Sequence, residues 1–312
     1  AMVIAAGHPA WSASDLRREA WVRLQTSVLD GSAFGSVAPP PLMKRTDQSS
    51  TVSTVVIQSY RTVAVPVWIE TCMQSVRDWA LSAEFSYEFV GDEIFDLLPD
   101  DYRQAAVGRI PVLTDLGRLL LIRRALEGRF DRAIWVDADV LVFHADCLSA
   151  PAKMDYAFCR EVWVQTNHRR PHNLKCFRNV HNAFCLFERG NPFLDFYIHA
   201  CERIVRAAAG EMPNQIVGTK FLTALHNMCG LPLLETVGMF SPLVIRDVAA
   251  GGGEAVACLR REIPGPLAAA NLCSSLFDGE ADGVALNDEL MVQVCRRLIA
   301  EGFAPSSSCS GS

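Results

Sequence analysis

From Thr54 onward the chain alternates between short apolar runs and longer segments with helical spacing. The first runs, rich in β-branched and aromatic residues as strands are, lie at 54–59, 85–91, 133–137 and 140–143. Helical spacing of apolar residues occurs at 65–81, where Pro66 is near the start, and at 113–128, where Thr114 is a candidate N-cap and Gly128 a stop signal. This alternation predicts an α/β fold, with a Rossmann-like, mostly parallel sheet flanked by helices.

The second half of the chain has a more mixed pattern. We expect a further strand within 179–190 and helices at 192–208, 215–228 and 286–301. In open α/β sheets, ligands bind where the loops converge at the carboxyl ends of the strands. The candidate chemistry is therefore sought at the ends of the predicted strands.

The first 50 residues have a different pattern from the rest. Residues 14–29 repeat apolar side chains on one helical face, and the stretch that follows is rich in Gly, Ser and Pro, as linkers are. We expect an N-terminal helix and linker at 1–50, a single catalytic domain at 51–304 and a flexible tail at 305–312.

Composition narrows the classes of protein that remain. Half of the residues are hydrophobic and the formal net charge is −6, so we expect a globular chain that does not bind nucleic acid through an overall basic surface. No apolar run approaches the roughly 18–20 residues of a membrane span, so no transmembrane segment is expected. The eleven cysteines include no C-x-x-C pair. Scattered thiols suit a reducing compartment and favour the cytoplasm, with a secreted form that carries a few bridges as the alternative.

The sharpest feature is the sequence Asp137-Ala138-Asp139 between two apolar runs. Two carboxylates at the end of a buried strand are costly unless a charge compensates them. Mg²⁺ or Mn²⁺ would do so, because these hard ions bind through one or two carboxylates together with substrate phosphates. The i, i+2 spacing points both carboxylates the same way if strand geometry persists. The alternative is a turn with solvated aspartates.

Together with Thr114-Asp115-x-x-Arg118 on the upstream helix, this motif resembles the glycosyltransferases of the GT-A fold. The chain is most similar to glycosyltransferase family 32, which includes capsular-polysaccharide and yeast-type mannosyltransferases. Weaker similarities follow in the family's order, at Asn182 with 190–193, at 217–223 and at 240–242.

The resemblance implies a GT-A fold, a UDP- or GDP-sugar donor, a saccharide or other hydroxyl acceptor, Mn²⁺ or Mg²⁺, and retention of anomeric configuration. It implies that Asp139 binds the metal directly and that Asp137 touches it through water or contacts the donor. Asp115 and Arg118, which share one helix face, would contact the donor sugar. Their alternative is a surface ion pair of little consequence.

Other positions are candidate substrate contacts. Gln58, Ser59 and Tyr60 end the first strand, where this fold places the nucleoside, and Tyr60 is a candidate for stacking on the base. Asn182 is a candidate contact to donor or acceptor, and Lys220 to a phosphate at the pocket rim.

The chain departs from the family in two places. Residues 129–136 replace a Tyr-Gly-Gly-x-Tyr-x-Asp segment, and 270–276 replace a segment with a late His. Asn271, in that second segment, is a candidate metal ligand through its carbonyl oxygen, which lacks charge and binds more weakly than a carboxylate.

These observations predict a metal-dependent glycosyltransferase, by resemblance one of polysaccharide biosynthesis. Two alternatives stay open. A nucleotidyltransferase would also use paired aspartates and a metal, but would release pyrophosphate. A degenerate, non-catalytic scaffold of the same fold would bind neither metal nor nucleotide.

Overall fold

A computed structural model describes residues 52–151, 154–167, 169–170, 173–208 and 212–303. The chain divides between Ser50 and Thr51 into two units, and the described residues all belong to the second. The predicted N-terminal helix, the linker and the tail lie outside the described residues, so the proposed domain boundaries stay predictions.

Six strands form the main sheet in the order β2-β1-β3-β6-β5-β7. Their bounds are β1 Thr54–Ser59, β2 Ser86–Val90, β3 Arg132–Val136, β5 Tyr156–Thr166, β6 Leu174–Glu188 and β7 Leu233–Leu234. Strand β1 is parallel to β2 and β3, and β7 is parallel to β5, whereas β6 is antiparallel to both of its neighbours. Strand β6 thus runs against the others, and the predicted mostly parallel sheet is confirmed.

A second, smaller sheet joins segments that are far apart in the sequence. It consists of β4 Val140–Val142, β9 Ala269–Asn271 and β8 Val237–Met239, in the order β4-β9-β8. Strands β4 and β9 are antiparallel, and their register pairs Val140 with Asn271. This pairing brings Asn271 next to the turn that contains Asp139. A hairpin of β10 Glu280–Ala281 and β11 Val284–Ala285 follows.

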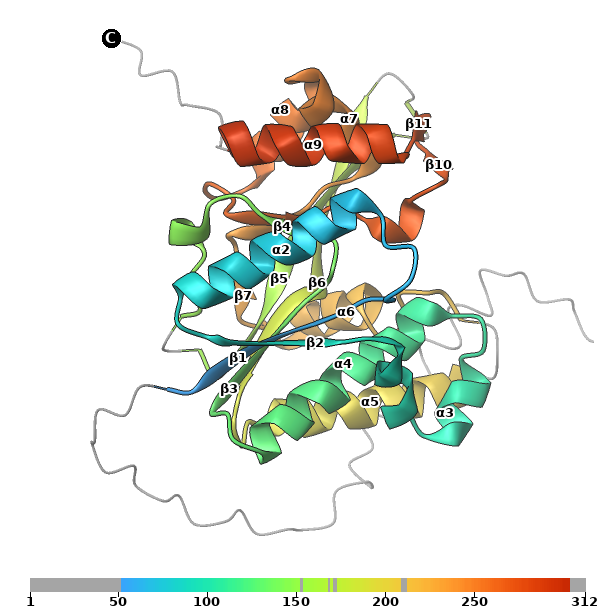
Figure 1. The fold of residues 1–312 in the computed structure, drawn as a ribbon. Helices are drawn as coiled ribbons and strands as arrows, with labels where there is room; N and C mark the ends of the chain where they lie inside the picture. Colours follow the sequence, from blue (N-terminus) through green and yellow to red (C-terminus); the bar gives the residue numbers. More distant parts are fainter. Residues whose placement is uncertain (1–51, 152–153, 168, 171–172, 209–211, 304–312) are drawn as a thin grey trace, which may run out of the picture. The chain divides into compact units, whose positions relative to one another are not determined.

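Helices cover both faces of the main sheet. Figure 1 shows α2 on one face and α4 with α5 on the other, while α7, α8 and α9 gather beyond α2. The α-helices are α2 Val67–Ser82, α3 Asp100–Ala105, α4 Ile110–Glu127, α5 Pro192–Ala208, α6 Thr219–Cys229, α7 Pro242–Ala250, α8 Glu254–Glu262 and α9 Asp288–Glu301. Short 3₁₀ turns lie at η1 Asp92–Leu97, η2 Ala145–Cys147 and η3 Ser274–Leu276.

Successive side chains along β3 pack against opposite faces of the main sheet. Ala133 and Trp135 pack with residues of α4 and α5, whereas Ile134 and Val136 pack with residues of α2. Because successive side chains of a strand point to opposite faces, the residue after Val136 returns to the α4 side. The sheet therefore directs Asp137 toward α4.

Most of the predicted elements are present near their expected bounds. Helix α4, however, begins at Ile110 with Pro111 in its first turn, so Thr114 lies inside the helix and its hydroxyl donates to the Ile110 carbonyl. The N-cap prediction at Thr114 was therefore wrong. The helix begins one turn earlier, where Pro111 fits because its fixed φ and its missing N–H suit the first helical turn. Strand β5 and the nine-residue helices α7 and α8 were not predicted. Helices of this length span few turns, and β5 does not alternate strictly between buried and exposed side chains, so their periodicity is weak.

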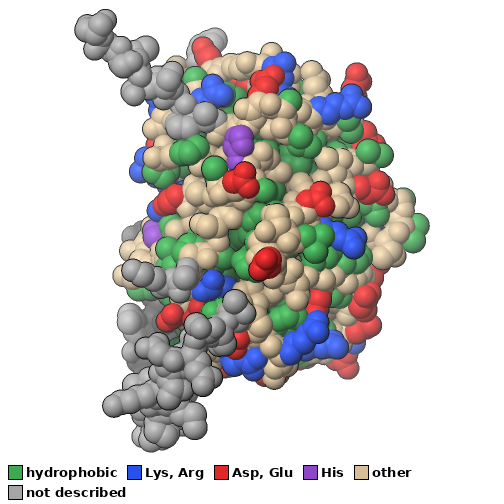
Figure 2. All heavy atoms as spheres, turned by 60° about the vertical axis from the view of Figure 1, so that its left-hand side comes forward, with side chains coloured by type: hydrophobic (Ala, Val, Ile, Leu, Met, Phe, Trp, Pro, Cys, Tyr) green, Lys and Arg blue, Asp and Glu red, His purple; other side chains and the backbone are tan. Residues whose placement is uncertain are grey.

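The surface seen in Figure 2 has mixed charge. On this face acidic and basic side chains are interspersed with apolar ones. Among the described residues, no helix is both long and apolar enough to cross a bilayer.

Candidate functional site

Arg118 lies at the centre of a buried charge cluster between α4 and the end of β3. Its Nη2 is 3.2 Å from Oδ1 of Asp115, and its Nη1 is 3.0 Å from Oδ1 of Asp137. Nη1 also donates to the Asn182 carbonyl over 2.8 Å. The side chains of Arg118 and Asp115 are only 6% and 7% exposed, so the alternative of a surface ion pair is excluded.

Strand β6 and the loop before α6 contact this cluster on the side of Asp115. The Nδ2 of Asn182 donates to Oδ1 of Asp115 over 2.9 Å and lies 3.3 Å from the Tyr197 hydroxyl. That hydroxyl donates to the Val217 carbonyl. A Cβ placed on Gly218 would come within 2.8 Å of Oδ2 of Asp115, so only glycine fits here without a shift.

Burial shapes the electrostatics of the cluster. It raises the pKa of Asp115, against the opposing effects of Arg118 and of the hydrogen bond from Asn182. It also raises the pKa of Asp137 to about 7, although Arg118 acts in the opposite direction. Burial disfavours the charged guanidinium as well, but Asp137 and Asp115 outweigh it and raise the pKa of Arg118. The cluster thus holds two carboxylates against one permanent positive charge.

Trp135 supports Asp137 from the same strand. Its indole nitrogen donates to Oδ1 of Asp137 over 2.6 Å, and the Arg118 guanidinium lies 5.3 Å from the indole ring centroid. Sequence reasoning missed this residue and Tyr197. The period of two along β3 was the available signal, since residues 135 and 137 share a face.

Asp139 has a different set of partners. Its Oδ1 accepts from the Asn271 Nδ2 over 2.7 Å, and its Oδ2 accepts from the Ser274 backbone N–H over 2.7 Å. The Asn271 carbonyl oxygen accepts from the Cys273 backbone N–H over 2.8 Å. The Asn271 side chain therefore donates a hydrogen bond to Asp139. Its carbonyl oxygen, which was expected to bind a metal, already accepts a hydrogen bond.

The two aspartates do not continue the strand. Strand β3 ends at Val136 and β4 begins at Val140, with a turn between them. The condition for both carboxylates to point the same way is not met, because the chain reverses within the motif. Asp137 contacts the α4 side, and Asp139 contacts β9 and η3.

The residues that end β1 lie near both aspartates. The Gln58 Nε2 donates to the Asp137 backbone carbonyl over 3.2 Å, and its Oε1 accepts from the Tyr87 hydroxyl. Burial raises the pKa of Tyr60, which Arg61 lowers and Asp139 raises, so the phenol lies within electrostatic range of Asp139. Ser59 instead bonds the Gly91 carbonyl.

Lys220 is exposed on α6, two residues after Gly218. Among the described residues its amine has no hydrogen bond or ion pair, so its proposed contact to a phosphate stays a prediction.

The carboxylate oxygens of Asp137 and Asp139 fit a divalent cation whose remaining ligands would come from a bound substrate and from water. No group of three or more His, Cys, Asp or Glu side chains among the described residues could enclose a metal. Oδ2 of Asp137 accepts no hydrogen bond from those residues, and this side chain is 24% exposed. Each oxygen of Asp139 keeps a second lone pair. Such a set matches the mode in which Mg²⁺ uses one or two carboxylates, waters and phosphates.

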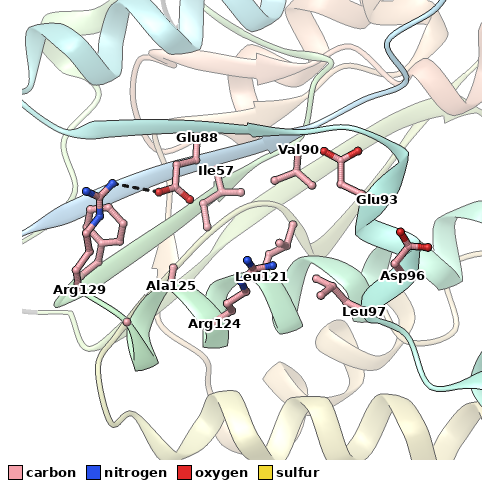
Figure 3. A pocket seen from close by; sticks show the side chains of 12 residues that line it. Ile57, Glu88, Val90, Glu93, Asp96, Leu97, Leu121, Arg124, Ala125 and Arg129 are labelled. Atoms are coloured by element: carbon pink, nitrogen blue, oxygen red, sulfur yellow. Dashed lines mark hydrogen bonds and ion pairs between the residues drawn. The ribbon is translucent and has the colours of Figure 1, made fainter.

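The described residues also form a cavity of about 600 Å³ elsewhere, between β2 and α4 (Figure 3). Ile57, Val90 and Leu121 line it together with charged residues, and an ion pair between Glu88 and Arg129 crosses one end. None of the predicted site residues lines this cavity.

Comparisons with known proteins find no matching family model and no match among curated sequences. Solved structures with a partial likeness include a glycosyltransferase involved in glycosylation of the major capsid of PBCV-1, at 10% identity and a TM-score of 0.39, covering 70% of this chain and 94% of that chain. Mouse xyloside xylosyltransferase 1 in its apo form matches at 9% identity and a TM-score of 0.37, covering 72% and 98%. A197 from STIV matches at 10% identity and a TM-score of 0.23, covering 45% and 66%.

Proposed function

We propose that the chain is a glycosyltransferase of the GT-A fold that uses a nucleotide-sugar donor, with UDP or GDP as the nucleotide. The observation that supports this most is the cluster of Asp115, Arg118 and Asp137, which lies at the carboxyl end of β3. Open α/β sheets bind ligands at this edge. The resemblance in the D-x-D and Asp-x-x-Arg motifs supports the same function.

In the proposed site, Asp137 and Asp139 would hold Mn²⁺ or Mg²⁺ together with the donor's phosphates. The ion would supply positive charge where the leaving nucleoside diphosphate becomes negative. Arg118 holds the Asp137 carboxylate in place through its Nη1, and Trp135 fixes the same oxygen. Oδ2 of Asp137 is thereby left for the ligand.

The Asp115 and Asn182 pair would position the donor sugar. Asn182 already donates to Oδ1 of Asp115, so the carboxylate keeps acceptor capacity for sugar hydroxyls. The resemblance implies retention of anomeric configuration, a reaction that needs no general base from the protein, so no base is assigned. The proposed acceptor is a saccharide or another hydroxyl compound.

The deciding experiment is calorimetric titration of UDP and GDP, each with Mn²⁺ and with chelator. Asp137→Asn is the sharpest variant, because its carbonyl oxygen can keep the hydrogen bonds from Arg118 and Trp135 while the charge and the free oxygen are lost. We expect metal-dependent binding of one nucleotide that weakens at least tenfold in this variant, a loss of about 1.4 kcal/mol or more. Asp96→Asn, an exposed residue of the separate cavity, is the matched control and should bind as the wild type does.

One observation favours the second candidate, a non-catalytic scaffold. Both oxygens of Asp139 and the carbonyl of Asn271 have partners within the protein, as in a purely structural turn. Absence of nucleotide binding with and without metal would support the scaffold and contradict the transferase. Release of pyrophosphate from a nucleoside triphosphate would instead indicate a nucleotidyltransferase.

A further inference from the structure

Two cysteines far apart in the sequence meet where β6 contacts α8. The Sγ atoms of Cys176 on β6 and Cys258 on α8 are 2.7 Å apart. Nonbonded sulfur atoms rarely approach so closely, and a disulfide needs only a further closing of the gap to about 2.05 Å.

A second side-chain contact also joins β6 to α8, close to the two cysteines. Arg178 forms an ion pair of 3.0 Å with Glu262. Arg178 lies two residues beyond Cys176 and so on the same face of the strand, and Glu262 lies one helical turn beyond Cys258 on the same side of α8. In Figure 1 the beginning of β6 reaches the layer that contains α8. The approach of the two sulfurs therefore follows from the docking of the two elements.

The pair is accessible to a small reagent, whereas most of the other described cysteines are not. Cys176 and Cys258 are half-buried, while Cys72, Cys159, Cys185, Cys201, Cys273 and Cys295 are buried. Burial and the neighbouring Cys258 thiol raise the pKa of Cys176 to about 12. Since the thiolate is the attacking species, we expect slow reaction at neutral pH.

We propose that Cys176 and Cys258 form a reversible disulfide that ties β6 to α8, by exchange with a small-molecule disulfide. One cysteine, as thiolate, attacks a sulfur of the reagent, whose S–S bond breaks and releases one reagent thiolate. The second cysteine, after loss of its proton, attacks the protein sulfur of the mixed disulfide and releases the second reagent thiolate. The two protons from the cysteines balance the two thiols released, so the protein pair is oxidised and the reagent disulfide is reduced.

The bridge would close a long loop. Cross-links of this kind stabilise mainly by restricting the unfolded chain, more so for longer loops. We therefore expect the oxidised protein to melt about 5–15 °C above the reduced protein. This site is independent of the proposed transferase activity, because none of its four side chains belongs to the cluster around Arg118.

The test equilibrates the full chain with oxidised glutathione or with dithiothreitol, blocks free thiols by alkylation, and digests with trypsin. Mass spectrometry should then find peptides 176–178 and 247–260 joined with the loss of two hydrogens in the oxidised sample alone. Cys176→Ser and Cys258→Ser should each abolish the joined species and the gain in Tm. Cys229→Ser, at an exposed cysteine, is the control and should retain both.

Two results would overturn the proposal. One is complete alkylation of both cysteines after equilibration with excess oxidised glutathione, and the other is a joined species that melts no higher than the reduced protein. The second outcome would mean that the native arrangement of β6 and α8 does not accept the bond.

Discussion

Arg118 and Asp137, contributed by α4 and by the end of β3, form an ion pair in which Nη1 lies 3.0 Å from Oδ1. The guanidinium also contacts Asp115 and the Asn182 carbonyl, so it joins three separate segments of the chain, α4, the end of β3 and β6. Its donors are directed at protein groups. Arg118 would therefore act on a ligand by holding two carboxylates, in addition to any direct contact with a sugar.

Replacement of Arg118 by Met should destabilise the protein strongly. The variant would leave the buried Asp115 and the partly exposed Asp137 without their counter-charge, and loss of one partner from a buried pair costs about 3–5 kcal/mol. Urea denaturation at neutral pH measures this effect. Arg123→Met is the matched control, because Arg123 is on the same helix, is 41% exposed and only approaches Glu127 at 4.0 Å. An equal decrease in the free energy of unfolding in the two variants would refute a special role for the buried guanidinium.

Replacement of Asp139 by Ala should cost stability as well as activity. The Ser274 N–H and the Asn271 amide would lose their acceptors, and each unsatisfied buried donor costs about 1–3 kcal/mol. We expect a decrease in the free energy of unfolding of about 2–4 kcal/mol, measured in urea. Asp146→Ala, at an exposed position in η2, should change it by less than about 0.5 kcal/mol. If Asp139→Ala were as stable as the wild type, the hydrogen bonds that join the turn to β9 and η3 would have no energetic role.

His181 should make stability dependent on pH. Burial, with a further contribution from Arg118, lowers its pKa to about 3, so the folded state keeps it neutral while the unfolded chain protonates it near pH 6.5. The unfolded state then binds more protons between these values, and stability falls as pH decreases through this window. The contribution is complete above pH 6.5 and should decrease by about 2 kcal/mol on going to pH 5.

The measurement compares urea unfolding of the wild type and His181→Gln from pH 5 to pH 7.5. Other groups titrate in both proteins and cancel in the difference, including Asp137, whose raised pKa acts in the opposite direction. The exposed His199→Gln is the control and should parallel the wild type. A wild-type curve parallel to that of His181→Gln would show that His181 is not held neutral.

Replacement of Gly218 by Ala should disturb the cluster through sterics alone. The added Cβ would lie 2.8 Å from Oδ2 of Asp115, so either the carboxylate or the loop before α6 must move. Overpacking of this kind costs about 1–3 kcal/mol, and a displaced Asp115 should also weaken nucleotide-sugar binding in calorimetry. Gly265→Ala adds the same methyl group with no heavy atom within 4 Å and is the control. Retention of both stability and binding in Gly218→Ala would mean that the loop adapts freely.

Local pattern was sufficient for much of the fold. The apolar runs ending near Ser59 and Val136 and the helical spacing after Pro66 identified β1, β3 and α2, because the strand and helix periods are set by backbone geometry alone. Strand β6 was found only in part. Its first residues, from Leu174, precede the apolar run and lie in a segment rich in basic residues. This segment is a strand because it pairs with β5.

The spatial relations among the candidate site residues were predicted only in part. Asp115 and Arg118 were expected on one face of a helix, which the ion pair confirms. The pairing of Asn271 with Asp139 depends on β9 lying beside β4, and the pairing of Arg118 with Asp137 depends on α4 covering β3. Neither relation has a local signature in the chain.

The sequence by itself determined the periods of the elements, the position of the two aspartates at the end of an apolar strand, and the shared face of Asp115 and Arg118. Only the tertiary structure decided that the chain turns within the D-x-D motif, that Arg118 is enclosed by carboxylates, and that Cys176 meets Cys258. The physical reason is that periodicity results from the geometry of neighbouring residues. Contacts between distant residues depend instead on strand order and on the packing of whole faces, which no short stretch of sequence specifies.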